Sequence, residues 1–197
     1  MVLLSVNLLA TSVTVYASIL TLISIGFTFM FLTAKVPNFA QGAFAVAGAY
    51  VTLSIVAFWH ASPYVSVPLA FVIGGVMALV TYKTVIKTLA KHGAGLVALS
   101  VSTIAVGIIV EAVLNIYANR MQALGIISQG FQLSINDFTF AGLPGVQLIS
   151  TVLAIVLIVS LYAFLNRTRF GVSMRATVED AELSSAMGIN VDRVTAI

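Results

Sequence analysis

The acidic residue that is the best candidate for a chemical role lies alone in a long uncharged stretch. Glu111 is the only charged residue between positions 92 and 119, and Asn115 follows one helical turn later on the same face. An ionisable residue at membrane depth is by default a candidate functional group, and this pair could line a pathway for a proton or cation. Alternatively, Glu111 lies about 9 Å from the expected end of its helix. There it could reach the interface or pair with Arg120.

A second polar cluster interrupts the apolar pattern at positions 36–42. It contains Pro37, the amides of Asn38 and Gln41, and Gly42. A helix that breaks at membrane depth can line a cavity, and its freed backbone groups then serve as ligands or hinges. An ordinary turn between two helices is the alternative. Asn38, Gln41 and Gly42 are therefore candidates for a translocation path, together with Glu111 and Asn115.

Metal and thiol chemistry find no support in the sequence. The two histidines, His60 and His92, have no acids at metal-ligand spacing, and the chain contains no cysteine. Disulfides, thiolate metal sites and thiol redox chemistry are thereby excluded. We predict no catalytic residue, no metal and no cofactor.

The composition defines the elements that must position these polar groups. Of 197 residues, 60% are hydrophobic and 8% are charged, whereas a soluble domain carries roughly 25% charged residues. A water-soluble protein is excluded. Uncharged runs long enough to cross a bilayer, which takes ~20 apolar residues, occupy positions 1–34, 36–82, 92–110 and 138–166. The net charge of +3 then reflects membrane topology rather than nucleic-acid binding.

We expect five membrane spans within a transmembrane bundle at 1–165. Charges, prolines and polar clusters place them near residues 13–32, 41–59, 65–82, 94–117 and 147–165. Lys83, Lys87 and Lys91 follow the third span, and four arginines follow the fifth, whereas the 118–146 loop holds only Arg120. Because basic residues concentrate in cytoplasmic loops, the lysines and the 166–197 segment should face the cytoplasm, with the 118–146 loop outside.

The external loop carries a β-hairpin pattern. Residues 131–135 alternate apolar and polar, Asn136 and Asp137 supply turn residues, and positions 138–140 alternate again. A short external hairpin is predicted. A plain connecting loop is the alternative.

The last 32 residues hold eight of the fifteen charges. Residues 173–187 have the composition of a helix, and Gly188 is placed to end it. Such a segment could lie on the membrane surface, insert into a groove of another protein, or serve as a solvated connector.

Two sets of motifs resemble the permeases of ABC importers for branched-chain amino acids. The cytoplasmic loop of that family is similar to Thr168-Arg169-Phe170-Gly171, Met174-Arg175-Ala176, Glu179-Asp180-Ala181-Glu182 and Gly188-Ile189-Asn190-Val191-Asp192-Arg193. A second hallmark is similar to Asn38-Phe39-Ala40-Gln41-Gly42, followed by Gly48-Ala49-Tyr50. A histidine is usual in the family where Gln41 stands here.

The resemblance implies an all-α polytopic helix bundle in the plasma membrane of a prokaryote, with a cytoplasmic coupling helix. The implied function is that of a permease subunit that imports branched-chain or other small amino acids. The implied partners are cytoplasmic ATP-binding subunits, a second related permease, an external substrate-binding protein and the lipid bilayer. The implied ATPase-coupling residues are Gly171, Arg175, Ala176, Glu179, Asp180, Glu182, Gly188, Ile189 and Asn190.

No Gly-x-x-x-x-Gly-Lys-Ser/Thr motif occurs in the chain, so ATP hydrolysis is expected on a separate subunit and this chain is not expected to be an enzyme. Permeases of this family continue for several spans beyond the loop, which implies an incomplete permease here. Three alternatives stay open: an importer of urea or short amides, a stand-alone secondary transporter or channel that uses Glu111, and a non-transporting scaffold.

Overall fold

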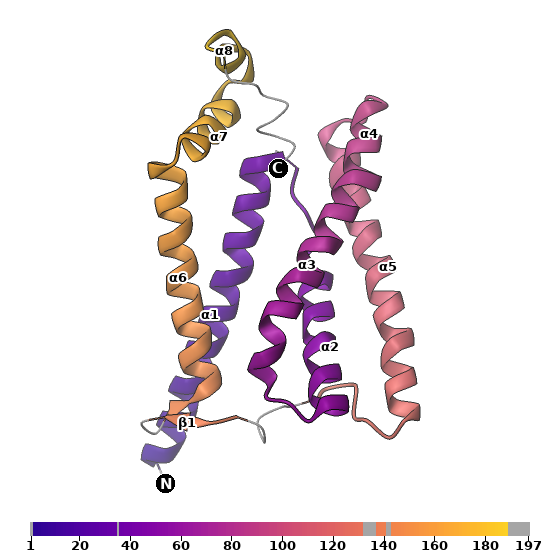
Figure 1. Ribbon diagram of the computed structural model, residues 1–197, viewed down its shortest axis with the longest axis vertical. Coiled ribbons are helices and arrows are strands. Elements are labelled where there is room, and N and C mark those ends of the chain that lie inside the picture. The colour runs from indigo at the N-terminus through magenta and orange to yellow at the C-terminus, as the bar shows by residue number, and fades with distance from the viewer. Residues whose placement is uncertain (1, 35, 132–136, 141–142, 189–197) are drawn as a thin grey trace. The chain divides into compact units, whose positions relative to one another are not determined.

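Five long apolar helices dominate the computed structural model, which describes residues 2–34, 36–131, 137–140 and 143–188 (Figure 1). Each helix is long and apolar enough to cross a membrane. The candidate spans are Leu9–Phe31, Gln41–Trp59, Pro63–Lys91, Leu96–Ala123 and Gly145–Arg167. The predicted all-α membrane fold with five spans and a small two-stranded hairpin is confirmed.

The chain divides into two compact units, each described by itself. The first unit comprises residues 1–37 and 139–197, and the second comprises residues 38–138. The elements of the first unit are α1 (Val2–Ala34), β1 (Thr139–Phe140), β2 (Leu143–Pro144), α6 (Gly145–Arg167), α7 (Arg169–Glu179) and α8 (Ala181–Ala186).

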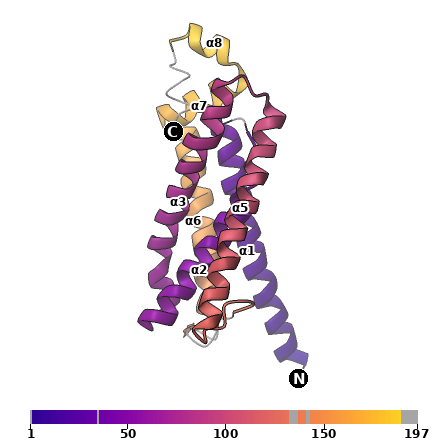
Figure 2. The same ribbon diagram turned by 90° about the vertical axis from the view of Figure 1, so that its right-hand side faces the viewer.

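In the first unit, α1 and α6 pack side by side and run in the same direction (Figures 1 and 2). The Ser18 hydroxyl lies 3.3 Å from the Thr151 hydroxyl. Nearer the other end, the rings of Phe29 and Phe164 meet edge to face with centroids 6.2 Å apart. The two pairs have nearly equal sequence separations, which is the pattern of a parallel helix pair.

The hairpin differs in register from the predicted one. Thr139 pairs with Pro144 and Phe140 with Leu143 in an antiparallel ladder, so the second predicted strand is in fact the first strand of the hairpin. The predicted first strand at 131–135 lies mostly outside the described residues. Asp137, expected in the turn, instead accepts a hydrogen bond from the Tyr64 hydroxyl. Asp137 therefore makes a tertiary contact and does not serve in the hairpin turn that its residue type favours.

The second unit contains α2 (Gln41–Trp59), the 3-10 turn η1 (Pro63–Ser66), α3 (Val67–Thr81), the π-helical turn η2 (Tyr82–Ile86), α4 (Lys87–Lys91) and α5 (Leu96–Ala123). The α2–α3 hairpin is joined by hydroxyls: Thr52 Oγ1 lies 2.7 Å from Ser66 Oγ, and the fully buried Ser66 donates to the Pro63 carbonyl.

Two helices of this unit extend past the spans expected at 65–82 and 94–117. From η1 through η2 to α4 the helix runs without a break from Pro63 to Lys91, and α5 runs to Ala123. Lysine and arginine near helix ends keep their charged groups in water while their stems cover apolar surface. The charges of Lys83 and Arg120 therefore do not end the helices on which they lie.

Candidate functional site

The polar segment before α2 forms a buried turn in the second unit. Asn38 is only 3% exposed, and its Oδ1 accepts a hydrogen bond from the Ala40 N–H at 3.0 Å. The Asn38 carbonyl accepts from the Gln41 N–H at 3.4 Å. Asparagine is suited to this position because its short side chain can bond to the backbone two residues ahead. These two hydrogen bonds of Asn38 turn the chain directly into α2, which begins at Gln41.

A hydroxyl of α5 anchors this turn. The Phe39 N–H donates to Thr103 Oγ1 at 3.1 Å, and the same hydroxyl donates to the Ser100 carbonyl at 2.7 Å. Thr103 is fully buried. One turn further along α5, a Cβ on Gly107 would lie 3.4 Å from the Ala40 Cα, so the absence of a side chain there permits close approach of the two backbones. Thr103 and Gly107 together form the surface of α5 against which the turn packs.

The turn is recessed from the end of the unit. Phe39 pairs with Thr103 and Ser54 pairs with Tyr117 at sequence separations of 64 and 63, so α2 and α5 run in parallel. Thr103 lies seven residues into α5, or about 10 Å from its start. Both views show α4 and the start of α5 reaching past α2 (Figures 1 and 2). This position favours a broken segment buried in protein over a turn at the tip of the unit.

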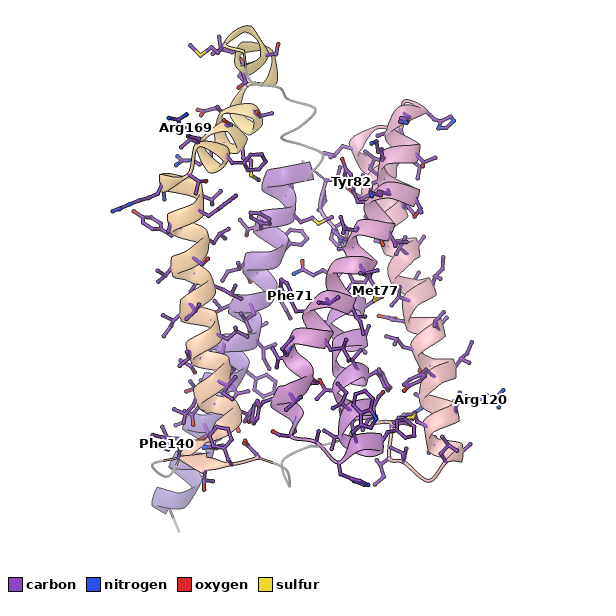
Figure 3. All side chains as sticks on the ribbon, in the orientation of Figure 1. Phe71, Met77, Tyr82, Arg120, Phe140 and Arg169 are labelled. Carbon is purple, nitrogen blue, oxygen red and sulfur yellow. The ribbon has the colours of Figure 1, made fainter. Side chains whose placement is uncertain are left out.

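A cavity of about 400 Å³ lies between α2, α3 and α5. Its lining is mainly apolar; Figure 3 labels one lining residue, Met77. The lining residues are Ala47, Tyr50, Val51, Ser54, Ile73, Met77, Ile109, Val110, Val113, Leu114 and Tyr117. A hydroxyl pair provides polarity, with Ser54 Oγ 2.6 Å from the Tyr117 OH. Such a space suits an apolar group with one hydrogen-bonding end.

The segment after α5 is tied to the cavity lining through Tyr50. The Tyr50 hydroxyl donates to the Ser128 carbonyl at 3.1 Å, and the buried Ser128 hydroxyl donates to the Ala118 carbonyl at 2.6 Å. The Tyr50 ring contacts the Tyr117 and Phe131 rings, with centroids 6.1 and 5.8 Å apart. The segment that follows α5 is thereby coupled to the helices that form the cavity.

The structure does not bring the predicted path residues together. Glu111 and Asn115 are both exposed, and the Asn115 amide donates to the Glu111 backbone carbonyl at 2.9 Å. Neither residue belongs to the cavity lining, and Glu111 lies eight residues beyond Thr103, about 12 Å along α5. Asn38 and Gln41 lie at the buried turn, whereas Gly42 is exposed. The path role of all five residues stays a prediction.

Removing the Tyr117 hydroxyl is expected to loosen this unit modestly. Tyr117→Phe keeps the ring and deletes the contact with Ser54, so the free energy of unfolding should fall by about 0.5–1.5 kcal/mol. The thermal unfolding midpoint of the detergent-solubilised protein measures the change. Tyr162→Phe is the matched control because Tyr162 is 70% exposed on α6. Equal midpoints for the two variants would contradict the assignment.

A second candidate site is the junction between α6 and α7 in the first unit. Thr168 caps α7: its Oγ1 accepts from the Gly171 N–H at 3.0 Å and donates to the Phe164 carbonyl at 2.6 Å. A Cβ on Gly171 would lie 2.3 Å from the Phe164 carbonyl oxygen and 2.7 Å from the Leu165 Cα. Only glycine fits this contact. We call residues 164–171 the elbow, because they fix the direction in which α7 leaves α6 (Figure 1).

The predicted cytoplasmic helix is two helices, not one. A continuous helix at 173–187 was expected, but α7 begins at Arg169 and ends at Glu179, and α8 covers Ala181–Ala186. Asp180 separates them with an extended backbone, and its carboxylate accepts from the Leu183 N–H at 3.0 Å. An aspartate that caps the following helix competes with continuation of the preceding one. Gly188 lies just beyond α8 with φ of +85°, as expected for a helix-ending glycine.

The remaining predicted coupling residues lie along this segment. Arg175 is exposed and donates to Asn166 Oδ1 at 2.8 Å, Ala176 is half-buried, and Glu179 is exposed at the end of α7. Ile189 and Asn190 lie outside the described residues, as does the side chain of Glu182. Their role in coupling stays a prediction.

Sequence reasoning did not single out Thr103, Tyr117, Ser128 or the capping role of Thr168. A threonine before a run of helix formers is a cap signal, so Thr168 could have been found. Thr103, Tyr117 and Ser128 make hydrogen bonds to residues far away in the sequence. No local sequence pattern predicts such contacts.

The structure as a whole defines a class of protein: a polytopic membrane protein whose fifth membrane-length helix leads directly into a polar helical segment. Residues 9–197 match the model of a family described as the branched-chain amino acid transport system permease component. The chain belongs to this permease family and is a multi-pass protein of the prokaryotic plasma membrane.

Relatives with curated names support the same family. The chain is 35% identical over 180 residues to the probable branched-chain amino acid transport permease protein LivH of Methanocaldococcus jannaschii, covering 91% of this chain and 57% of that protein. It is 27% identical over 186 residues to the high-affinity branched-chain amino acid transport system permease protein LivH of Salmonella typhimurium, covering 89% and 60%. The chain thus spans less than two thirds of these relatives. No solved structure matches it.

Proposed function

We propose that this chain is the transmembrane permease subunit of an ATP-driven, binding-protein-dependent importer of branched-chain or other small amino acids. Family membership and the names of the relatives support the substrate class. The observation that carries the coupling role is the elbow, where Gly171 packs against the backbone of Phe164 and Leu165. A close backbone contact of this kind makes α7 a rigid continuation of α6.

The elbow suits the transmission of movement into the membrane. When ATP-binding subunits change conformation, a helix docked on them moves with them, and the energy derives from different contacts in the two states. Because the Thr168 cap and the Gly171 contact leave little room for hinging, movement of α7 should reorient α6. The Ser18–Thr151 and Phe29–Phe164 contacts then extend the movement to α1.

The proposal assigns four kinds of partner. Cytoplasmic ATP-binding subunits would dock on α7 and α8 through Arg175, Glu179, Asp180 and Glu182, and would hydrolyse ATP. A second related permease would complete the path, and an external binding protein would deliver the substrate. Lipid would cover the apolar helix faces that the chain leaves exposed, such as Val152, Val156 and Tyr162 on α6.

Reversing the charge of Glu179 and neutralising that of Asp180 is expected to weaken binding of the ATP-binding subunits roughly tenfold, because exposed ion pairs contribute up to about 1 kcal/mol each. The variant Glu179→Lys with Asp180→Asn tests this. Asparagine keeps the acceptor that caps α8, and lysine at the end of α7 favours the helix dipole. Co-purification of the subunits with the permease is the measurement.

Arg120→Glu is the control, because it reverses an exposed charge on α5 and should leave co-purification unchanged. Unaltered association in the Glu179/Asp180 variant would refute docking through these charges. A different outcome would identify a secondary transporter. In that case an ion gradient would drive uptake into proteoliposomes without ATP, and Glu111→Gln would abolish this uptake.

A further inference from the structure

We propose that Lys83, Lys87 and Lys91 form a binding site for the phosphate-bearing headgroups of anionic phospholipids. All three side chains are exposed and lie four residues apart on the continuous helix from Pro63 to Lys91. Residues at this spacing share a helix face. We call the three residues the lysine ladder. The proposal rests on the membrane fold and is independent of what the protein transports.

The helix offers the ladder no acidic partner. Residues 36–110 contain neither Asp nor Glu, so no intrahelical ion pair is available at either flank. Like charges four residues apart repel each other. The arrangement is therefore unfavourable in isolation and becomes favourable when an external anion lies between the ammonium groups.

A π-helical turn aligns the ladder. In an α-helix each step of four residues overshoots a full turn by about 40°, so a row of lysines at this spacing drifts around the axis. The turn η2 at Tyr82–Ile86 takes more residues per turn, which offsets the drift between Lys83 and Lys87. Within η2, Ile86 is buried while Lys83 is exposed. Turns of this type are rare and often mark functional sites.

The ladder is long enough to cross the whole headgroup layer of one leaflet. Lys83 and Lys91 are separated by about 12 Å along the helix. The polar region on each side of a bilayer is ~5–8 Å thick. Lys83 can reach this layer from the edge of the hydrocarbon through its apolar stem, and Lys91 can reach it from the aqueous side. Figure 3 labels Tyr82 beside the start of the ladder, and tyrosine is enriched at membrane interfaces.

The charge pattern selects the lipid over a protein surface. The ladder begins on a helix that is apolar enough to cross the membrane, and its first lysine lies one residue after the uncharged run 36–82. Each basic residue beside a span and near the membrane surface is attracted to anionic lipid by about 1 kcal/mol. The ladder should therefore act without any other subunit.

Binding is tested with the purified protein in nanodiscs of phosphatidylcholine with and without phosphatidylglycerol. Native mass spectrometry measures which lipid is retained. Wild-type protein should prefer phosphatidylglycerol, and added salt should weaken the preference. Replacing all three lysines with glutamine should reduce the preference roughly a hundredfold, whereas replacing all three with arginine should retain it. The same preference in the triple glutamine variant would overturn the proposal.

A charge-matched variant guards against effects on membrane insertion. Exchanging residues 87 and 88, as Lys87→Thr with Thr88→Lys, keeps the composition but moves one charge off the ladder. Binding should fall between wild type and the glutamine variant. Wild-type binding in this variant would refute the aligned site. A lysine effect that requires added cytoplasmic subunits would assign the ladder to a protein partner and also overturn the proposal.

Discussion

Replacing Gly171 with alanine is expected to reduce ATP-driven uptake by more than tenfold. The new Cβ would lie 2.3 Å from the Phe164 carbonyl oxygen and 2.7 Å from the Leu165 Cα. Both neighbours are backbone atoms, so they cannot rotate aside, and the elbow must shift. Forcing extra volume into a packed site costs about 1–3 kcal/mol. Uptake of radiolabelled amino acid into proteoliposomes with the assembled subunits measures the loss.

The matched control is Gly75→Ala in α3, where a Cβ meets nothing within 4 Å. Alanine is favoured over glycine within a helix by about 1 kcal/mol, so this variant should transport normally and unfold no earlier than wild type. A Gly171→Ala protein that transports at the wild-type rate would contradict the rigid-elbow account. Loss of uptake with ATP-binding subunits still bound would separate transmission from docking.

Replacing Thr103 with valine is expected to lower the free energy of unfolding by about 1–3 kcal/mol. Valine matches threonine in shape but cannot accept from the Phe39 N–H or donate to the Ser100 carbonyl. The turn at Asn38 would lose its anchor at a fully buried position. The thermal unfolding midpoint in detergent reports stability, and uptake reports whether the turn must be seated for transport.

Two further substitutions at this site distinguish the hydroxyl from general packing. Thr103→Ser keeps the hydroxyl and should recover most of the lost stability. Ser102→Ala removes only a contact with the Leu99 carbonyl within the same helix, and its effect should be within about 0.5 kcal/mol. If valine at 103 were as stable as serine, the anchoring role of the hydroxyl would be wrong.

Hydropathy predicted the five long helices because membrane helices are defined by length and by scarcity of charge. The helix ends were harder to predict. Lys83, Lys87 and Lys91 were assigned to a connecting loop, yet they lie on a helix that continues to Lys91. A lysine stem can lie along an apolar helix while its charge stays in water, so charge alone does not end a helix.

The candidate sites were predictable only where the signal was local. Asn38 was singled out by its place beside Pro37, and the structure buries it. The partner that seats it, Thr103, is 64 residues away and has no sequence signature. The break at Asp180 was missed because composition favoured helix throughout, whereas a single side-chain cap decided the outcome. A local sequence pattern identifies a residue, such as Asn38, that differs from its neighbours. It does not predict the residue's partner in the fold, such as Thr103.

The last residue of α2, Trp59, is the only tryptophan in the chain, and it is 73% exposed. Intrinsic indole fluorescence of this protein therefore reads a single location without any engineered label. Quenching by lipids brominated at known carbon positions converts that emission into a depth for the end of α2. The buried turn at Asn38 lies just before the first residue of the same helix. Trp59 emission therefore reports on the end of α2 that is opposite to the turn held by Thr103.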